Sequence, residues 1–568
     1  MASPRPRPAA SPRGARFGPF FNTLIVAGGY LLSRVLGLGR DVIISAQFGT
    51  LPEYGAYRAT FSILDLIYIV IAGGALGSAF IPVFAGFLSE QREDDAWRLA
   101  SGLLNLAFVA LVLACLLIGL LADPLVALTI GRGFTPDQRA LTALLLRLML
   151  VQPVLLGLGG LAKATLESFD RFALPAIGSN LYNIGIIGGA LLAPWLGIYG
   201  LVWGVVVGAA LFLLVQLPGL RAVGMRYIWN VERRTQNAEQ AARRSMFYAL
   251  RSALYAPGLG RVGRLLGPRL FGQAAWQVNQ IALVSFASIL GAGTVAANGY
   301  ALTLMLLPHG LIALSLGTVI FPQLARLHAA GDRATFRDTT VGALRSVLFL
   351  ALPASAILGI LAQPIVRALF ERGKFTAAST ALTSEALVFY LLGLWAFAAA
   401  EIVVRSFYAM QDTRRPVLVG VGTVLLNIGL SWTLLQLGGG LDGLAFAFSV
   451  ANMVEATVLL ALLRPRLGRL GGAFWRAVGS MLLATLVSGG ALLVVRLASS
   501  RLLPYLAPAA GYRWPADFLP LALWLAAASG LGALAYGGTA ALLRLEEMRA
   551  AWARVARLAG RLRPSRAA

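Results

Sequence analysis

Apolar stretches long enough to cross a lipid bilayer recur along almost the whole of this chain and leave no interval the size of an ordinary soluble domain. Hydrophobic residues fill 58% of the 568 positions and charged residues only 13%, whereas soluble domains carry about 25% charged residues. Inside a bilayer the backbone must satisfy its own hydrogen bonds, which leaves helices or closed barrels. Because the apolar runs are continuous rather than alternating, the sequence predicts an all-α, polytopic membrane protein.

The predicted spans follow from the requirement for about 20 predominantly apolar residues per membrane-crossing helix. Their even number places both termini on the same side of the membrane. We expect 14 transmembrane helices, at 18–45, 58–86, 99–122, 141–164, 174–194, 198–218, 268–291, 297–325, 340–363, 382–408, 416–436, 442–463, 474–498 and 516–543.

The net charge of +24 comes almost entirely from arginine, because Lys163 and Lys374 are the only lysines. The arginines gather in alternate loops between the apolar runs, as charges that set membrane orientation do on the cytoplasmic side. This distribution favours two cytoplasmic termini and argues against a nucleic-acid partner. One loop, with Arg367, Arg372 and Lys374, departs from the alternation.

A weak internal repeat relates the two halves of the chain. Its matched segments are Leu76–Pro82 with Leu316–Pro322, and Asp170–Pro175 leading into Asn183–Gly185 with Asp412–Pro416 leading into Asn427–Gly429. Repeated halves are typical of secondary transporters, which bind their substrate between the two lobes near the middle of the membrane. The repeat therefore predicts two pseudo-symmetric six-helix lobes followed by two extra helices.

The interval between the lobes is the only long polar one, and aromatic and apolar residues alternate there with paired arginines. This pattern favours a helix in the anionic cytoplasmic interface over a disordered linker. The predicted organisation is a disordered basic tail, an N-lobe, a cytoplasmic amphipathic linker, a C-lobe, a two-helix segment and a basic cytoplasmic tail, at 1–17, 18–218, 219–267, 268–463, 464–545 and 546–568.

The residues that usually carry catalysis are sparse and scattered. Cys115 is the only cysteine and lies within an apolar run, and His309 and His328 are distant from each other and from any acidic cluster. Neither a disulfide, a metal site nor a nucleotide-binding loop is indicated. We therefore expect a transporter rather than an enzyme, with no cofactor, driven by an ion gradient or the membrane potential.

Charged residues within the spans are the main candidates for a substrate site, because burying them in the membrane is costly. Arg34, Arg40 and Asp41 lie on the first span. Arg34 has apolar sequence on both sides, whereas Arg40 and Asp41 are adjacent and partly offset one another. Arginine suits phosphate, because its planar fork donates two hydrogen bonds and keeps its charge. Arg34 in a cavity therefore predicts an anionic substrate such as a lipid pyrophosphate; the alternative is a side chain that reaches the headgroup layer.

Weaker candidates lie on other spans. Glu401 and Arg405 are four residues apart, so an intrahelical ion pair explains them as well as substrate contact does. Gln277 belongs to a polar stretch that lines the cavity or joins helices by hydrogen bonds. The remaining charged candidates within spans are Asp65, Arg147 and Glu455.

Several segments resemble one known family. They are Ser33–Asp41, Phe172–Pro175 with Asn183 downstream, Gly373–Thr376, and Ser406–Pro416. They are similar to motifs of the MurJ/MviN lipid II flippases, within the multidrug/oligosaccharidyl-lipid/polysaccharide exporter superfamily. The resemblance covers about residues 20–545, and its last two motifs are fairly specific to the family.

The resemblance implies two lobes around a central cationic cavity, transport by alternating access, and a groove near helices 13 and 14 for a long prenyl tail. It implies lipid II as substrate, surrounding membrane lipids and cell-wall synthesis proteins as partners, and the bacterial cytoplasmic membrane as location. Arg34 and Arg40 match the cavity arginines of the family. Tyr68 and Thr303, however, stand where the resemblance leads us to expect arginines, and Gly55 where we expect an aspartate.

These neutral positions keep other functions open. The alternatives are a flippase for another polyprenyl-linked glycan, a drug or ion antiporter of the same superfamily, and a membrane scaffold that has lost transport. Loss of transport on replacing Arg34 distinguishes a carrier of pyrophosphate lipids from a scaffold, and a drug exporter should favour acidic over basic cavity residues.

Overall fold

The computed structural model describes residues 19–72, 74–228, 256–468, 471–503, 512–550 and 552–553. Every regular element within these ranges is a helix. The tail predicted over 1–17, the core of the predicted linker at 229–255 and most of the C-terminal tail lie outside the described residues.

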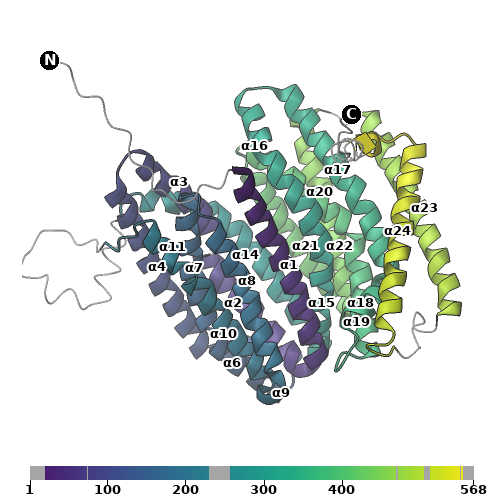
Figure 1. Ribbon diagram of the computed structural model, residues 1–568, viewed down its shortest axis with the longest axis horizontal. Helices are drawn as coiled ribbons and strands as arrows, with labels where there is room; N and C mark the ends of the chain where they lie inside the picture. Colours follow the sequence, from purple (N-terminus) through teal and green to yellow (C-terminus); the bar gives the residue numbers. More distant parts are fainter. Residues whose placement is uncertain are drawn as a thin grey trace, which may run out of the picture.

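The first half of the chain builds one helical body, on the left of Figure 1. Most of these helices run side by side along the long direction of that body. They are α1 (Pro19–Phe48), α2 (Pro52–Ala72), α3 (Gly74–Ser89), α4 (Glu93–Leu120), α5 (Ala122–Leu128), α6 (Pro136–Met149), α7 (Val151–Ser168), α8 (Ala173–Leu191), α9 (Ala193–Leu196), α10 (Ile198–Leu214) and α11 (Leu217–Ala222).

The second half builds another body, whose helices run from teal through green to yellow and lie mostly on the right, although α14 is drawn to the left of α1 (Figure 1). Its elements are α14 (Leu259–Ile289), α15 (Ala292–His309), the π-helix η1 (Gly310–Leu314), α16 (Ser315–Ala329), α17 (Arg333–Ile360), α18 (Ala362–Phe370), α19 (Ala377–Leu392), α20 (Leu394–Ala409), α21 (Arg414–Gln436), α22 (Leu441–Leu467), α23 (Gly472–Leu502) and α24 (Phe518–Leu542). Helix α14 begins within the range predicted for the linker.

Ten helical stretches in the described residues are long and apolar enough to cross a membrane, or eleven if the pair α19 and α20, bent by 45°, forms one span. Helices α1, α8 and α14, which overlap the predicted spans 18–45, 174–194 and 268–291, do not belong to that set. The polytopic helical architecture is therefore confirmed, while the number of 14 spans and the division into two six-helix lobes remain predictions.

Local sequence explains where several helices begin. Thr135 precedes α6 and forms a capping box, in which its hydroxyl accepts from the Gln138 amide at 3.3 Å and the Gln138 side chain accepts from the Thr135 amide at 3.1 Å. Asp332 precedes α17 and accepts from the Thr335 amide at 3.0 Å. Hydrogen bonds from Thr335 keep the pKa of Asp332 below its usual value, so this N-cap stays charged and favours the helix start.

Small residues bring α8 and α10 into close contact. A methyl group added to Gly185 would lie 2.6 Å from the amide nitrogen of Gly208, and one added to Gly204 would lie 2.9 Å from the Gly185 oxygen. Helices in lipid associate largely through such close packing, because lipid tails are as apolar as their side chains. Gly185, Gly204 and Gly208 thus serve the packing of these two helices.

The two bodies meet tightly at one end of α1. There the Lys374 amide donates to the Ala46 oxygen at 2.9 Å, and the hydroxyls of Thr50 and Ser379 lie 2.7 Å apart. The hydroxyl of Tyr300 donates to the Gly49 oxygen at 3.3 Å. We call this region, formed by residues 46–55, 131–133, 288–293 and 373–379, the sealed end.

Candidate functional site

Arg34 lies near the midpoint of α1, 15 residues after Pro19 and 14 residues before Phe48. At 1.5 Å per residue it is about 21 Å from the sealed end. A methyl group added to Gly310 would lie 2.6 Å from Arg34 Nη1, so the guanidinium rests against the first residue of η1 in the second body. The structure thus places this cation near the middle of α1, in contact with the second body.

Arg34 also remains available to a ligand. Its side chain is exposed, and it makes no ion pair or hydrogen bond within the described part of the chain. His309 precedes Gly310 and stacks on Phe397 with ring centroids 4.1 Å apart. The glycine that Arg34 contacts therefore lies directly after this stacked pair.

Arg40, by contrast, is committed to neighbouring groups. Its guanidinium contacts the Asp41 carboxylate at 2.9 Å and donates to Asn183 Oδ1 on α8 at 3.2 Å. The amide nitrogen of Asn183 in turn donates to the hydroxyl of Ser33 at 3.2 Å. These contacts join Ser33 and Arg40 to α8, and they make Arg40 and Asp41 a structural pair at the edge of the site.

The structure adds Arg58, which the sequence did not single out. Arg58 lies on α2 and crosses to the second body, where a methyl group on Gly299 would lie 2.6 Å from its Nε. It is half-buried and has no ion pair or hydrogen bond among the described residues. The predicted span began at residue 58, which put this arginine at the membrane surface. Because α2 begins at Pro52 instead, Arg58 lies within the span.

Two of the weaker candidates on α2 lie near this arginine. Asp65 is exposed and follows Arg58 by seven residues, which places both on one face of the helix, and Arg58 acts on it electrostatically. Tyr68 is half-buried and packs against the hydrophobic core. On α15, the hydroxyl of Thr303 donates to the oxygen of Gly299 at 2.9 Å, so it is engaged within its own helix.

Three other candidates, Glu401, Arg405 and Gln277, have no hydrogen bond or ion pair with Arg34 among the described residues. Glu401 and Arg405 form the intrahelical pair on α20, at 2.7 Å. Arg405 also lies against Gly317 of α16, where a methyl group would come within 2.6 Å of its Cδ. Gln277 is buried in α14 with 3% of its surface exposed. These three residues lie away from Arg34 in the chain, and no contact in the structure brings them to it.

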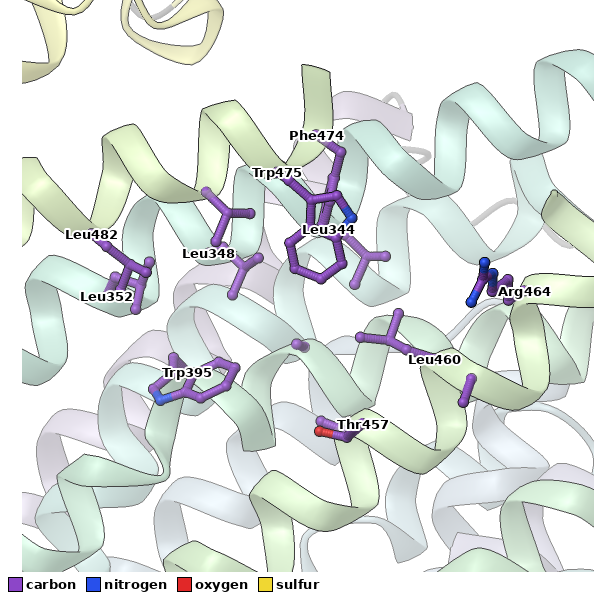
Figure 2. Close-up of a pocket in the computed structure, with 14 residues that line it drawn as sticks. Leu344, Leu348, Leu352, Trp395, Thr457, Leu460, Arg464, Phe474, Trp475 and Leu482 are labelled. Carbon is purple, nitrogen blue, oxygen red and sulfur yellow. The ribbon is translucent and has the colours of Figure 1, made fainter. Parts of the chain in front are cut away.

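An apolar cavity of about 610 Å³ lies between α17, α20, α22 and α23 (Figure 2). Aromatic and aliphatic side chains line it, and Arg464 lies at one end. The residues that line it are Leu344, Leu348, Leu352, Trp395, Ala399, Ala456, Thr457, Leu460, Ala461, Arg464, Phe474, Trp475, Val478 and Leu482. The lining includes α23, which corresponds to predicted helix 13, but no residue of α24.

Comparison with known proteins decides which family this architecture represents. A match to the family described as lipid II flippase MurJ covers residues 44–507. The lipid II flippase MurJ of Burkholderia cenocepacia is 31% identical over 453 residues, which cover 78% of this chain and 84% of that protein. The chain belongs to the lipid II flippase MurJ family.

Further relatives agree with this assignment. A MurJ relative from Haemophilus influenzae is 28% identical over 90% of this chain and 98% of its own length. A solved structure of lipid II flippase MurJ in an inward closed conformation shares the fold, with a TM-score of 0.71 and 23% identity over 90% of this chain and 98% of that one. An inward-facing transporter of the multidrug resistance MATE family shares it with a TM-score of 0.60 and 16% identity, over 77% and 94%.

The family assignment confirms the resemblance predicted from the motifs and places the chain among multi-pass transporters of the bacterial inner membrane. In the structure, the motif Gly373–Thr376 forms part of the sealed end. The motifs did not indicate that Lys374 acts there through its backbone amide, which bonds to Ala46.

Proposed function

We propose that this protein moves lipid II, the lipid-linked peptidoglycan precursor, across the bacterial cytoplasmic membrane by alternating access, and so supports cell-wall biogenesis. The observation that carries the proposal is Arg34, an exposed cation near the middle of α1 that has no ion pair in the described chain and lies against the second helical body. A guanidinium in this position suits a pyrophosphate, which accepts its paired hydrogen bonds.

The orientation of the chain in the membrane determines the direction of transport. With both termini in the cytoplasm, the sealed end faces outwards, and the headgroup enters from the cytoplasm and binds at Arg34. Separation of the bodies at the sealed end then releases it on the far side. An inside-negative membrane potential contributes about 2.3 kcal/mol per 100 mV for each negative charge that moves outwards, so the potential favours export of an anionic headgroup.

The apolar cavity provides a place for the prenyl tail. Its volume and its lining of leucine and aromatic side chains suit a hydrocarbon chain, and Arg464 at one end suits the charged part of a lipid (Figure 2). This position differs from the expected groove near helices 13 and 14, because α17, α20 and α22 line the cavity together with α23.

Complementation of a flippase-depleted bacterium tests the proposal. Wild type should restore growth and Arg34→Ala should not, although it reaches the membrane in equal amount. Arg92→Ala is the matched control, because Arg92 is an exposed arginine that pairs with Glu90 and Asp95 at the start of α4. Failure of the wild-type chain despite good expression, or growth supported by Arg34→Ala, would contradict the proposal.

A second candidate is a flippase for another polyprenyl-linked glycan. The observation in its favour is that Tyr68, Thr303 and Gly55 are neutral where the resemblance leads us to expect charges. Competition of different polyprenyl-pyrophosphate glycans for the purified protein distinguishes the two substrates, because only the preferred headgroup should displace labelled lipid II at low concentration.

A further inference from the structure

Two arginines of the first body reach across to α15 and η1 of the second body, and neither forms an ion pair with any residue that the structure describes. Arg34 rests on Gly310 and Arg58 rests on Gly299, 11 residues earlier on the same candidate span, Ala292–Ala329. The glycines leave room for each guanidinium to lie flat on the helix, where any larger side chain would collide with it.

Neither of the two carboxylates near Arg58, Asp41 and Asp65, forms an ion pair with it in the described chain. Asp41 acts on Arg58 electrostatically, but its carboxylate is bonded to Arg40 at 2.9 Å. Asp65 lies seven residues further along α2, about 10 Å away along the helix axis. A half-buried cation without a counter-ion is costly in a membrane span and usually marks a functional site.

The three arginines lie at different distances from the sealed end. Arg58 lies six residues after Pro52, about 9 Å from the sealed end, whereas Arg34 lies about 21 Å from it. Arg40, at an intermediate depth of about 12 Å, is occupied by Asp41 and Asn183. An anion that leaves Arg34 towards the sealed end therefore meets Arg58 as the next cation with free hydrogen-bond donors.

We propose that Arg58 is a second anion-binding residue of the transport path, which takes the pyrophosphate of the polyprenyl lipid from Arg34 and holds it beneath the sealed end. This inference rests on the proposed function and adds a residue to it. Arg58 also brings a cation from α2 close to Thr303 on α15. Arg58 contacts Gly299, and Thr303 lies one helical turn after Gly299 and donates a hydrogen bond to its oxygen.

Binding and transport by purified variants test the inference. The variants are Arg58→Gln, Arg58→Lys, Arg34→Gln and Gly299→Ala, with Arg92→Gln as the matched control for loss of an arginine charge. The binding probes are lipid II and three short-chain lipids: farnesyl pyrophosphate, farnesyl phosphate and farnesol. Transport of labelled lipid II is measured in proteoliposomes.

We expect Arg58→Gln to lower the affinity for lipid II and farnesyl pyrophosphate at least about tenfold, because a charge-assisted hydrogen bond is lost, and to leave farnesol binding unchanged. Arg58→Lys should recover part of the affinity, which also separates the loss of charge from a failure to fold. Gly299→Ala should weaken pyrophosphate binding with the charge intact, because the added methyl displaces the guanidinium.

Several outcomes separate the inference from the proposed function. If Arg34→Gln abolishes lipid II transport while Arg58→Gln matches wild type in affinity and rate, the role of Arg58 is refuted and the proposed function stands. If wild type fails to transport lipid II but binds farnesyl pyrophosphate through Arg58, the substrate is wrong and the anion site stands. Equal binding of farnesyl pyrophosphate and farnesol by wild type overturns the anion site.

Discussion

Replacing Gly55 with alanine should open the sealed end. The added methyl would lie 2.6 Å from the carbonyl carbon of Ala292 and closer still to its oxygen. Both are backbone atoms at the start of α15, so no side-chain rotation relieves the collision, and α2 and α15 must move apart. Overpacking of this kind costs about 1–3 kcal/mol, which lowers the ratio of sealed to unsealed molecules by about 5- to 150-fold.

Cross-linking across the sealed end measures this shift. The Thr50 and Ser379 hydroxyls lie 2.7 Å apart on the two bodies, so cysteines at these positions should form a disulfide in the sealed state. The double cysteine protein is built with Cys115→Ala, because Cys115 is the only native cysteine. In membranes, Gly55→Ala should slow formation of the cross-link in proportion to the lost sealed population.

The control is Gly342→Ala on α17, where an added methyl meets no atom within 4 Å. This change should leave the cross-linking rate unaltered and favour the helix slightly. Cross-linking of Gly55→Ala at the wild-type rate, in a protein of unchanged thermal stability, would refute the argument that the glycine allows the two bodies to close.

Three further changes test other parts of the structure. Asn183→Ala should lower the thermal stability of the purified protein by about 1–3 kcal/mol, because it removes a partly buried partner of Arg40 and Ser33; an unchanged melting temperature contradicts this. Leu348→Trp should fill part of the apolar cavity and lower the affinity for long-chain lipid II more than for farnesyl pyrophosphate, and equal losses argue against tail binding there. Gly204→Val should prevent α8 and α10 from packing, so little folded protein is expected by size-exclusion chromatography, and a normal yield of monodisperse protein refutes the close-packing argument.

The fold was predictable from sequence because its signals are local. Long apolar runs indicate helices whatever surrounds them, and the i,i+4 spacing of Glu401 and Arg405 indicated the ion pair that α20 contains. Breaks within apolar runs were harder to locate. The span predicted over 58–86 consists of two helices, α2 and α3, and the first begins at Pro52. The error of six residues at this boundary concealed Arg58.

The contacts between the two bodies were beyond the reach of the sequence. Gly299 and Gly310 look like ordinary packing glycines in an apolar run, and only their distance from Arg58 and Arg34 shows that each accommodates a guanidinium. Pairings of this kind join residues about 240 to 280 positions apart in the chain, and no local pattern encodes them. The sealed end was unpredicted for the same reason.

Arg34 and Arg40 show that the candidate residues of this site are better ranked by whether their charge is already paired than by whether they belong to a family motif. They lie six residues apart on one helix and within one motif, and the resemblance gives both the same role. The structure separates them, because Asp41 and Asn183 occupy the guanidinium of Arg40 while that of Arg34 has no such partner in the described chain. A phosphate at Arg40 must first displace an existing carboxylate, so its binding gains less than the same contact at Arg34. Arg58 meets the criterion that Arg40 fails, although it belongs to no motif, and we therefore propose a transport path through Arg34 and Arg58.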